Sequence, residues 1–137
     1  MSLRKKTTTS LIAASATVMM LTAPVFAAWS DVEADALVSF SNYSNYYKMN
    51  GTSKVTAYGS KGSGEALYNN IWITLDGGSY YSNDSLGSTN PSTLKHTTGQ
   101  QGDGATWGVV STGTIYQNGV PTTVTHKNKH DKSHPGM

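Results

Sequence analysis

The sequence predicts an all-β protein, a small antiparallel β-sandwich or barrel with about six strands. Beyond the first 27 residues, glycine, serine, threonine, asparagine and tyrosine dominate, whereas leucine, glutamate and arginine are scarce. This composition favours strands and tight turns over helices. Apolar and polar residues alternate in several short segments, as they do in strands with one buried face. Two of these segments adjoin Asp-Gly or Asn-Gly pairs, which adopt the backbone angles of hairpin turns.

Segment 1–27 is predicted to be a cleavable signal peptide. Residues 1–6 are rich in positive charge and residues 11–26 are mainly apolar, which is the order that directs a chain to export. The side chains of Val25 and Ala27 suit a cleavage site directly after Ala27. The apolar run is shorter than the roughly 20 residues of a membrane-spanning helix. We therefore expect a secreted, extracellular protein with no stable membrane anchor after cleavage.

Cleavage would change the charge of the protein. The whole chain has a net charge of +2, but the part after residue 27 has seven lysines, no arginine and eight acidic residues. Three of the lysines lie at positions 127, 129 and 132, so the preceding body is acidic. Proteins that bind nucleic acids need clustered lysine and arginine, and we therefore expect no nucleic-acid partner. The chain contains no cysteine, so its fold does not depend on disulfides.

The firmest local prediction is a hairpin within residues 113–125 whose two-residue turn is Asn118-Gly119. Its register places three residues on the side that faces the core, namely Ile115, Val120 and Val124. Pro121 lacks an N–H group, and the second arm is therefore predicted to be an edge strand. A second hairpin is predicted around Asp76-Gly77-Gly78, with Ile71, Ile73 and Leu75 facing inward. The other strands are predicted by alternation at residues 36–43, 54–58 and 106–112.

Two polar segments are predicted to lie outside the strands. Residues 82–104 are polar and include Asn90-Pro91, which is typical of a long loop. Residues 127–137 have no apolar side chain before the final methionine and are predicted to form a disordered tail rich in lysine and histidine. A single β domain is accordingly expected over residues 28–126.

Three histidines recur every four residues near the C-terminus, at His126, His130 and His134. In a flexible tail, two or three imidazoles can gather weakly on zinc or copper. The alternative is a soluble tail that gains positive charge as its histidines take up protons. No cofactor is expected.

Tyrosine is abundant, and five tyrosines form a tentative ligand-binding surface: Tyr43, Tyr46, Tyr47, Tyr80 and Tyr81. Their rings offer apolar faces with hydroxyl groups, which suit sugars or protein surfaces. Each adjacent pair places one ring on each side of a strand, so one ring of each pair should be exposed. The alternative is that the tyrosines occupy half-buried sheet positions and that Trp72 and Trp107 belong to the core.

Catalytic motifs are not found in the sequence. The glutamates beyond the signal peptide are Glu33 and Glu65, and nothing in their spacing selects them as a catalytic pair. Because no set of residues converges on a known reaction, we do not expect an enzyme.

Four short motifs, in order, resemble the lactococcin 972 family of secreted bacteriocins. They are Tyr-Ser-Asn-Tyr-Tyr at 43–47, Ser-Lys-Val-Thr-Ala at 53–57, Asn-Ile-Trp at 70–72 and Ser-Tyr-Tyr at 79–81, within a region of about residues 29–81. The resemblance implies a cysteine-free β-sandwich that binds a cell-wall precursor of related bacteria and blocks septum formation. This chain lacks the family's glycine-rich stretch around the first tryptophan and continues beyond residue 81.

The sequence thus predicts a secreted, non-enzymatic binding protein that acts at a bacterial cell surface, as a bacteriocin-like growth inhibitor. Two alternatives stay open, a carbohydrate- or cell-wall-binding module and a structural protein of an extracellular matrix. The expected partner is a cell-envelope component or a polysaccharide, and the sequence does not define the oligomeric state. A polysaccharide-binding module should carry a coplanar row of exposed tryptophan and tyrosine on one sheet face.

Overall fold

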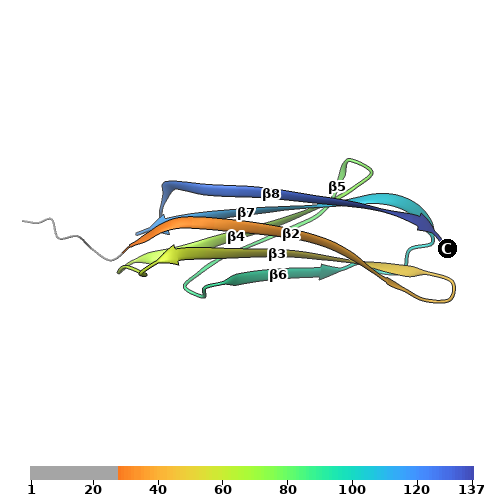
Figure 1. The fold of residues 1–137 in the computed structure, drawn as a ribbon, viewed down its shortest axis with the longest axis horizontal. Coiled ribbons are helices and arrows are strands. Elements are labelled where there is room, and N and C mark those ends of the chain that lie inside the picture. Colours follow the sequence, from red (N-terminus) through yellow and green to blue (C-terminus); the bar gives the residue numbers. More distant parts are fainter. Residues whose placement is uncertain (1–27) are drawn as a thin grey trace, which may run out of the picture.

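Two antiparallel sheets pack against each other in the structure, a computed structural model that describes residues 28–137 (Figure 1). One sheet has three strands in the order β2-β3-β6, and the other has four in the order β5-β4-β7-β8. The predicted all-β class is confirmed, with seven strands and no helix among the described residues. The strands are β2 (Trp29–Asn42), β3 (Tyr47–Gly59), β4 (Glu65–Leu75), β5 (Gly78–Gly87), β6 (Ser92–Thr97), β7 (Asp103–Gln117) and β8 (Val120–Gly136). The predicted signal peptide lies outside these residues.

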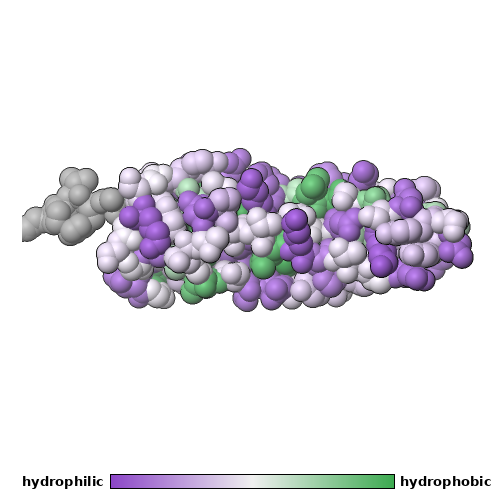
Figure 2. Space-filling view, turned by 90° about the horizontal axis from the view of Figure 1, so that it is seen from below, coloured by the Kyte–Doolittle hydropathy of each residue, from purple (hydrophilic) through white to green (hydrophobic). Residues whose placement is uncertain are grey.

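The sandwich is elongated because several strands are long. β2 has 14 residues, β7 has 15 and β8 has 17. β2 begins at one end of the molecule, and the C-terminus lies at the other end (Figure 1). Figure 2 shows one face of this body, on which hydrophilic and intermediate residues cover most of the surface and hydrophobic residues form small separate areas.

The interior contains two apolar clusters. One is formed by Trp29, Val32, Ala34, Val55, Ala57, Leu67 and Ile115, and the other by Val38, Tyr47, Met49, Ile71, Ile73, Trp107 and Val109. Alternation along each strand produces both clusters, since every second side chain points between the sheets. Each cluster includes residues from both sheets, so hydrophobic burial holds the two layers together.

A polar layer separates the two clusters along the strands. Ser53, Asn69 and Ser111 are fully buried, and each stands on its strand between residues of the two clusters. The Ser53 hydroxyl donates to Asn69 Oδ1 at 2.6 Å and lies 2.6 Å from the Ser111 hydroxyl. Asn69 Nδ2 donates to the carbonyl oxygens of Ser53 and Ser92, at 3.1 Å and 3.0 Å. These bonds join β3 and β6 of one sheet to β4 and β7 of the other.

Both predicted hairpin turns are confirmed. Asp76 and Gly77 have φ values of 49° and 85° between β4 and β5, and Asn118 and Gly119 have φ values of 51° and 80° between β7 and β8. Left-handed values at both central residues are what such two-residue turns require. β8 is an edge strand, as Pro121 predicted.

The register beyond the second turn differs from the prediction. Ile115 is buried and Val124 packs against the first apolar cluster, as expected, but Val120 is 64% exposed. Val120 pairs with Gln117 directly beside the turn, at the end of the sheet, and both residues are exposed. A register shift follows between Thr114 and Tyr116, because Tyr116 pairs with Pro121 whereas Thr114 pairs with Thr125, so β8 carries extra residues opposite Ile115.

The prediction of a disordered tail at 127–137 is wrong. This segment is the longer part of β8, which pairs with β7 as far as Asp103 and Gly136. The predicted loop at 82–104 is also wrong, since β5 continues to Gly87 and β6 occupies Ser92–Thr97. β5, β6 and β8 are all edge strands. Edge strands hold many polar residues because water reaches them, so hydropathy alone did not reveal them.

Candidate functional site

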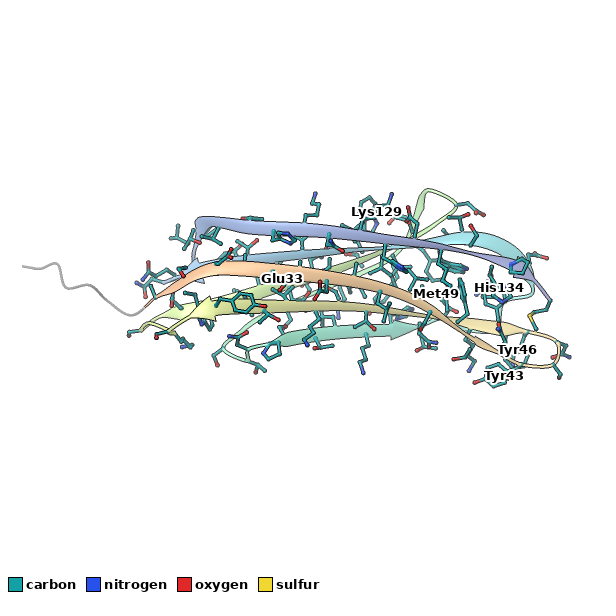
Figure 3. The ribbon with its side chains drawn as sticks, in the orientation of Figure 1. Glu33, Tyr43, Tyr46, Met49, Lys129 and His134 are labelled. Atoms are coloured by element: carbon teal, nitrogen blue, oxygen red, sulfur yellow. The ribbon has the colours of Figure 1, made fainter. Side chains whose placement is uncertain are left out.

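The structure does not bring the five predicted tyrosines together on one surface. Tyr43 and Tyr46 lie in the connection between β2 and β3, at the end of the molecule shown in Figure 3, with ring centroids 4.7 Å apart and nearly parallel planes. Tyr47 is fully buried. Its hydroxyl donates to the Asp103 carbonyl at 2.8 Å and accepts the indole N–H of Trp107 at 3.1 Å. Tyr47 is therefore a core residue, and Tyr46 beside it is half-buried.

The second tyrosine pair lies on β5. Tyr80 is exposed, and its ring meets that of Trp107 edge-on with centroids 5.0 Å apart. Tyr81 is half-buried and stacks on His96 of β6 at 3.7 Å. A register shift opposite Ile73 and Thr74 accounts for these contacts, because a bulge lets neighbouring side chains reach the same side of a strand.

The three histidines are also separated. His126, His130 and His134 lie along β8 at intervals of four residues, so neighbouring Cα atoms are about 13 Å apart, which is too far for one metal ion. Among residues 28–137, no group of three histidine, cysteine or acidic side chains is close enough to hold a metal. The hypothesis of a metal held by a flexible tail is therefore wrong. Each histidine is instead hydrogen-bonded to β2.

An aromatic surface lies on the outward side of the four-stranded sheet. Ile71 and Ile73 are buried, so Trp72 between them points outward and is 41% exposed. Its indole N–H donates to the Ser79 hydroxyl of β5 at 3.0 Å, which orients the ring over the sheet. We call this surface the Trp72 face. It comprises Tyr68, Asn70, Trp72 and Thr74 of β4 with their β7 partners Thr114, Thr112, Val110 and Gly108, and the flanking Tyr116.

Aromatic rings on the Trp72 face lie in one row. Tyr68 stands four residues before Trp72 on β4, about 13 Å away along the strand. Tyr116 of β7 lies beyond Tyr68, and the centroids of these two rings are 5.9 Å apart. Val110 of β7, which is paired with Trp72, contributes an apolar side chain beside the Trp72 ring. The row thus offers a series of ring surfaces on one side of the molecule.

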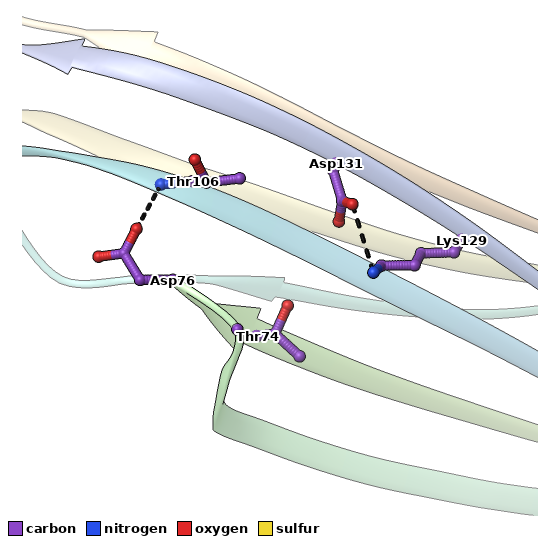
Figure 4. A pocket seen from close by; sticks show the side chains of 6 residues that line it. Thr74, Asp76, Thr106, Lys129 and Asp131 are labelled. Carbon is purple, nitrogen blue, oxygen red and sulfur yellow. Dashed lines mark hydrogen bonds and ion pairs between the residues drawn. The ribbon is translucent and has the colours of Figure 1, made fainter.

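A polar cavity adjoins Trp72. It has a volume of about 410 Å³ and is lined by Thr74, Asp76, Gly77, Thr106, Lys129 and Asp131 (Figure 4). Asp76 Oδ1 accepts the Thr106 N–H at 2.8 Å, and Lys129 Nζ lies 3.3 Å from Asp131 Oδ2. Gly108 stands between Thr74 and Asp131 in the sheet, and a Cβ atom there would collide with both side chains. Glycine at this position therefore lets the two polar side chains lie over the sheet.

The Trp72 face and the adjoining cavity together present the two kinds of group that bind sugars. Aromatic rings pack against the C–H faces of a pyranose, while hydroxyl, carboxylate and ammonium groups bond to its hydroxyls. Alternation already indicated the position of Trp72, since Ile71 and Ile73 were expected to face inward. The alternative that Trp72 belongs to the core is wrong, whereas Trp107 is indeed fully buried. Lys129 and Asp131 were missed because their segment was predicted to be disordered.

The two glutamates have other contacts. Glu65 is buried, and its carboxylate accepts the backbone N–H groups of Trp29 and Gly62 at 3.0 Å and 2.7 Å. Exposed Glu33 accepts the hydroxyl of Tyr58 at 2.6 Å. This hydrogen bond is the main reason that the pKa of Tyr58 is raised above 10.0.

The hydroxyl of Tyr68 is expected to ionise late in an alkaline titration. Burial raises its pKa above 10.0, and the negative charge of Asp84 raises it further. Since the folded chain favours the protonated form, the contribution of Tyr68 to stability is complete below pH 10.0 and is lost as the pH rises through the raised pKa. The ultraviolet difference titration between the protein and its Tyr68→Phe variant measures this ionisation. Asp84→Asn should lower the pKa, and a Tyr68 that titrates at or below 10.0 would contradict the expectation.

Comparison with known proteins gives no relative for this chain, since a scan against protein-family models, a search of curated proteins and a search of solved structures each found no match. Within residues 28–137, no helix has the length and apolar character needed to cross a membrane.

Proposed function

We propose that this chain is a secreted, non-enzymatic binding protein that attaches to a polysaccharide of a bacterial cell surface through the Trp72 face. The observation that carries the proposal is the row of Tyr116, Tyr68 and Trp72 on one side of one sheet. A row of rings suits a polysaccharide-binding module, which was one of the alternatives that the sequence left open, although the half-buried rings of Tyr68 and Tyr116 are inclined by 51° and not coplanar. The predicted signal peptide supports an extracellular location.

The proposed binding mode places one sugar ring on Trp72. The hydroxyl groups of the neighbouring sugar then lie in the adjoining cavity. Trp72 is held by its bond to Ser79, so little side-chain freedom is lost when a ligand binds. Thr74, Lys129 and Asp131 present a donor hydroxyl, an ammonium group and a carboxylate beside the ring. A polysaccharide chain would then continue along β4 towards Tyr68 and Tyr116.

Substitution of Trp72 tests the proposal. The chain from residue 28 is incubated with insoluble peptidoglycan, cellulose and chitin, and the bound fraction is measured after sedimentation. Trp72→Ala is expected to weaken binding roughly tenfold or more, as is usual for a central aromatic contact. Leu37→Ala is the matched control, because Leu37 is 53% exposed and lies on the other sheet. It should bind like the unsubstituted protein.

Two results would overturn the proposal. The first is that the unsubstituted protein binds none of the three polymers. The second is that both substitutions weaken binding equally while circular dichroism shows that each variant is folded. A growth test on related bacteria with the same two variants addresses the inhibition that the lactococcin 972 resemblance implies, and Trp72→Ala should abolish any inhibition that depends on wall binding.

A further inference from the structure

The side of the sandwich between β2 and β8 is closed by histidine side chains. These strands are edges of different sheets and lie next to each other (Figure 1). His126 Nδ1 accepts the backbone N–H of Ala34 at 3.1 Å, and His130 Nδ1 accepts that of Val38 at 3.0 Å. His134 Nε2 lies 2.7 Å from Asn42 Oδ1. We call these three contacts the histidine seam.

The histidine seam follows the repeat of the strands. The partners in all three contacts are 92 residues apart, so β2 and β8 run in parallel along the seam. On the edge of a β-strand, outward-directed N–H groups recur every two residues. His126 and His130, four residues apart, therefore meet every second free N–H of β2. Imidazole nitrogens supply the acceptors that a neighbouring strand would otherwise provide.

Two of these contacts require neutral histidine. A nitrogen that accepts a backbone N–H carries no proton of its own, so Nδ1 of His126 and of His130 is unprotonated in the closed seam. Uptake of a proton there converts the acceptor into a donor that faces another donor. Histidine as a residue type takes up this proton between about pH 5 and 8. A ring protonated at Nδ1 is therefore incompatible with either contact.

His134 responds differently. Its Nδ1 accepts the N–H of Gly136 at 2.9 Å, so Nε2 carries the proton and donates to Asn42. This donation survives protonation of the ring. His134 is also buried and stacks on Tyr47 with centroids 3.7 Å apart. The contact to Asn42 is therefore expected to hold the end of the seam while the other two contacts open.

The charged groups near the seam are acidic residues that point away from it and one lysine that lies along it. Glu33 and Asp35 flank Ala34 on β2 but belong to the outward-facing, exposed set of that strand. On β8, Lys127, Lys129 and Asp131 occupy the alternate positions, and Lys132 Nζ lies over the Phe40 ring at 5.7 Å. β7 presents Gly113 opposite His126 and Val109 opposite His130, neither of which titrates. Among residues 28–137, no carboxylate forms an ion pair with a seam histidine that would favour its charged form.

We propose that His126 and His130 form a pH-sensitive closure, which holds β8 against β2 at neutral pH and releases the β2 edge in mildly acidic surroundings. The proposal rests on the seam alone and does not depend on the proposed function of the Trp72 face. Release would free the N–H groups of Ala34 and Val38 and leave the β2–β3 pairing in place, because those two N–H groups point away from β3.

Hydrogen exchange of single backbone amides, followed by NMR, tests this closure. Protection factors of the Ala34 and Val38 amides are compared at about pH 7.5 and about pH 5.5, on either side of most histidine titrations. Their protection should fall roughly tenfold at the lower pH, as loss of one hydrogen bond each allows. Amides in the middle of the β4–β7 pairing should keep their protection. Unchanged protection of Ala34 and Val38 would overturn the proposal.

A double substitution separates titration from packing. In His126→Asn with His130→Asn, each Oδ1 stands the same number of bonds from the backbone as Nδ1 and accepts an N–H, but it does not titrate. The Ala34 and Val38 amides should then stay protected at both pH values. His96→Asn is the matched control, because His96 stacks on Tyr81 at the opposite side of the sandwich, and it should retain the original response. Loss of protection at the lower pH in the double variant would also overturn the proposal.

Discussion

A chain that ends at His126 is expected not to form the two-sheet structure. This truncation removes the β8 residues that pair with β7 from Asp103 to Thr112, together with two of the three seam histidines. Trp107 and Val109 would lose the strand beside them, and β2 would lose its neighbour. A typical domain is stable by only about 5–15 kcal/mol, so the loss of most of the edge strand that closes the sandwich exceeds what it tolerates.

Far-ultraviolet circular dichroism and urea denaturation of the truncated chain measure this effect. We expect no cooperative unfolding transition. A chain that lacks only Met137 is the matched control, because it keeps all of β8 and loses one backbone bond, from Met137 N–H to the Gly102 carbonyl. It should unfold cooperatively. A cooperative transition of normal midpoint in the chain that ends at His126 would show that residues 127–137 are dispensable.

Replacement of Asn69 by leucine is expected to lower the free energy of unfolding by about 3 kcal/mol, although leucine is apolar and the site is buried. The side chain of Asn69 bonds to Ser53 and to the carbonyl of Ser92 between the two apolar clusters. Its loss leaves buried polar groups of both sheets without partners, which costs more than an apolar contact contributes. Urea denaturation measures the difference in free energy.

Two further variants define the cause. Asn70→Leu is the matched control, since Asn70 is the next residue on β4 and its amide bonds at the exposed surface, so the change should be under about 1 kcal/mol. Adding Ser53→Ala and Ser111→Ala to Asn69→Leu removes the Ser53 hydroxyl, which lost its acceptor, and the Ser111 hydroxyl bonded to it, and part of the stability should return. If Asn69→Leu is as stable as the original chain, the polar layer is not a stabilising element.

The hairpins could be predicted from the sequence because their signals are local. Asp76-Gly77 and Asn118-Gly119 adopt positive φ values that few other residue pairs accept, so two residues define each turn. Alternation of Ile71 and Ile73 likewise defined the inner side of β4. These signals do not depend on which strands become neighbours.

The role of β8 could not be predicted in the same way. Its residues alternate between two polar types, with Lys127 and Lys129 on the outer side and His126 and His130 towards β2. A hydropathy pattern does not distinguish these types. The inner histidines are accommodated because β2 is the edge of its sheet and presents free N–H groups to β8. This neighbourhood depends on the order of strands in the two sheets.

The candidate site was predicted in part. A surface of aromatic residues was expected, but the prediction assigned it to tyrosines close together in the sequence. One of these, Tyr47, is buried. A bulge in β5 determines the contacts of Tyr80 and Tyr81 and leaves no trace in the spacing of the residues. The polar cavity depends on Asp76 and Asp131, which are far apart in the sequence and meet only through the order β4-β7-β8.

The position of β8 beside β2 has a consequence for the rate and order of folding. The first and last strands of the sandwich are neighbours, and their contacts join residues 92 positions apart. Contacts between residues so far apart in the sequence form slowly, because the chain entropy lost on closing a long loop is not offset until the contacts have formed. Docking of β8 is therefore expected to be the late step of folding. For export through the predicted signal peptide, the strands that are synthesised first would have no complete sandwich to enter until the last strand had followed them.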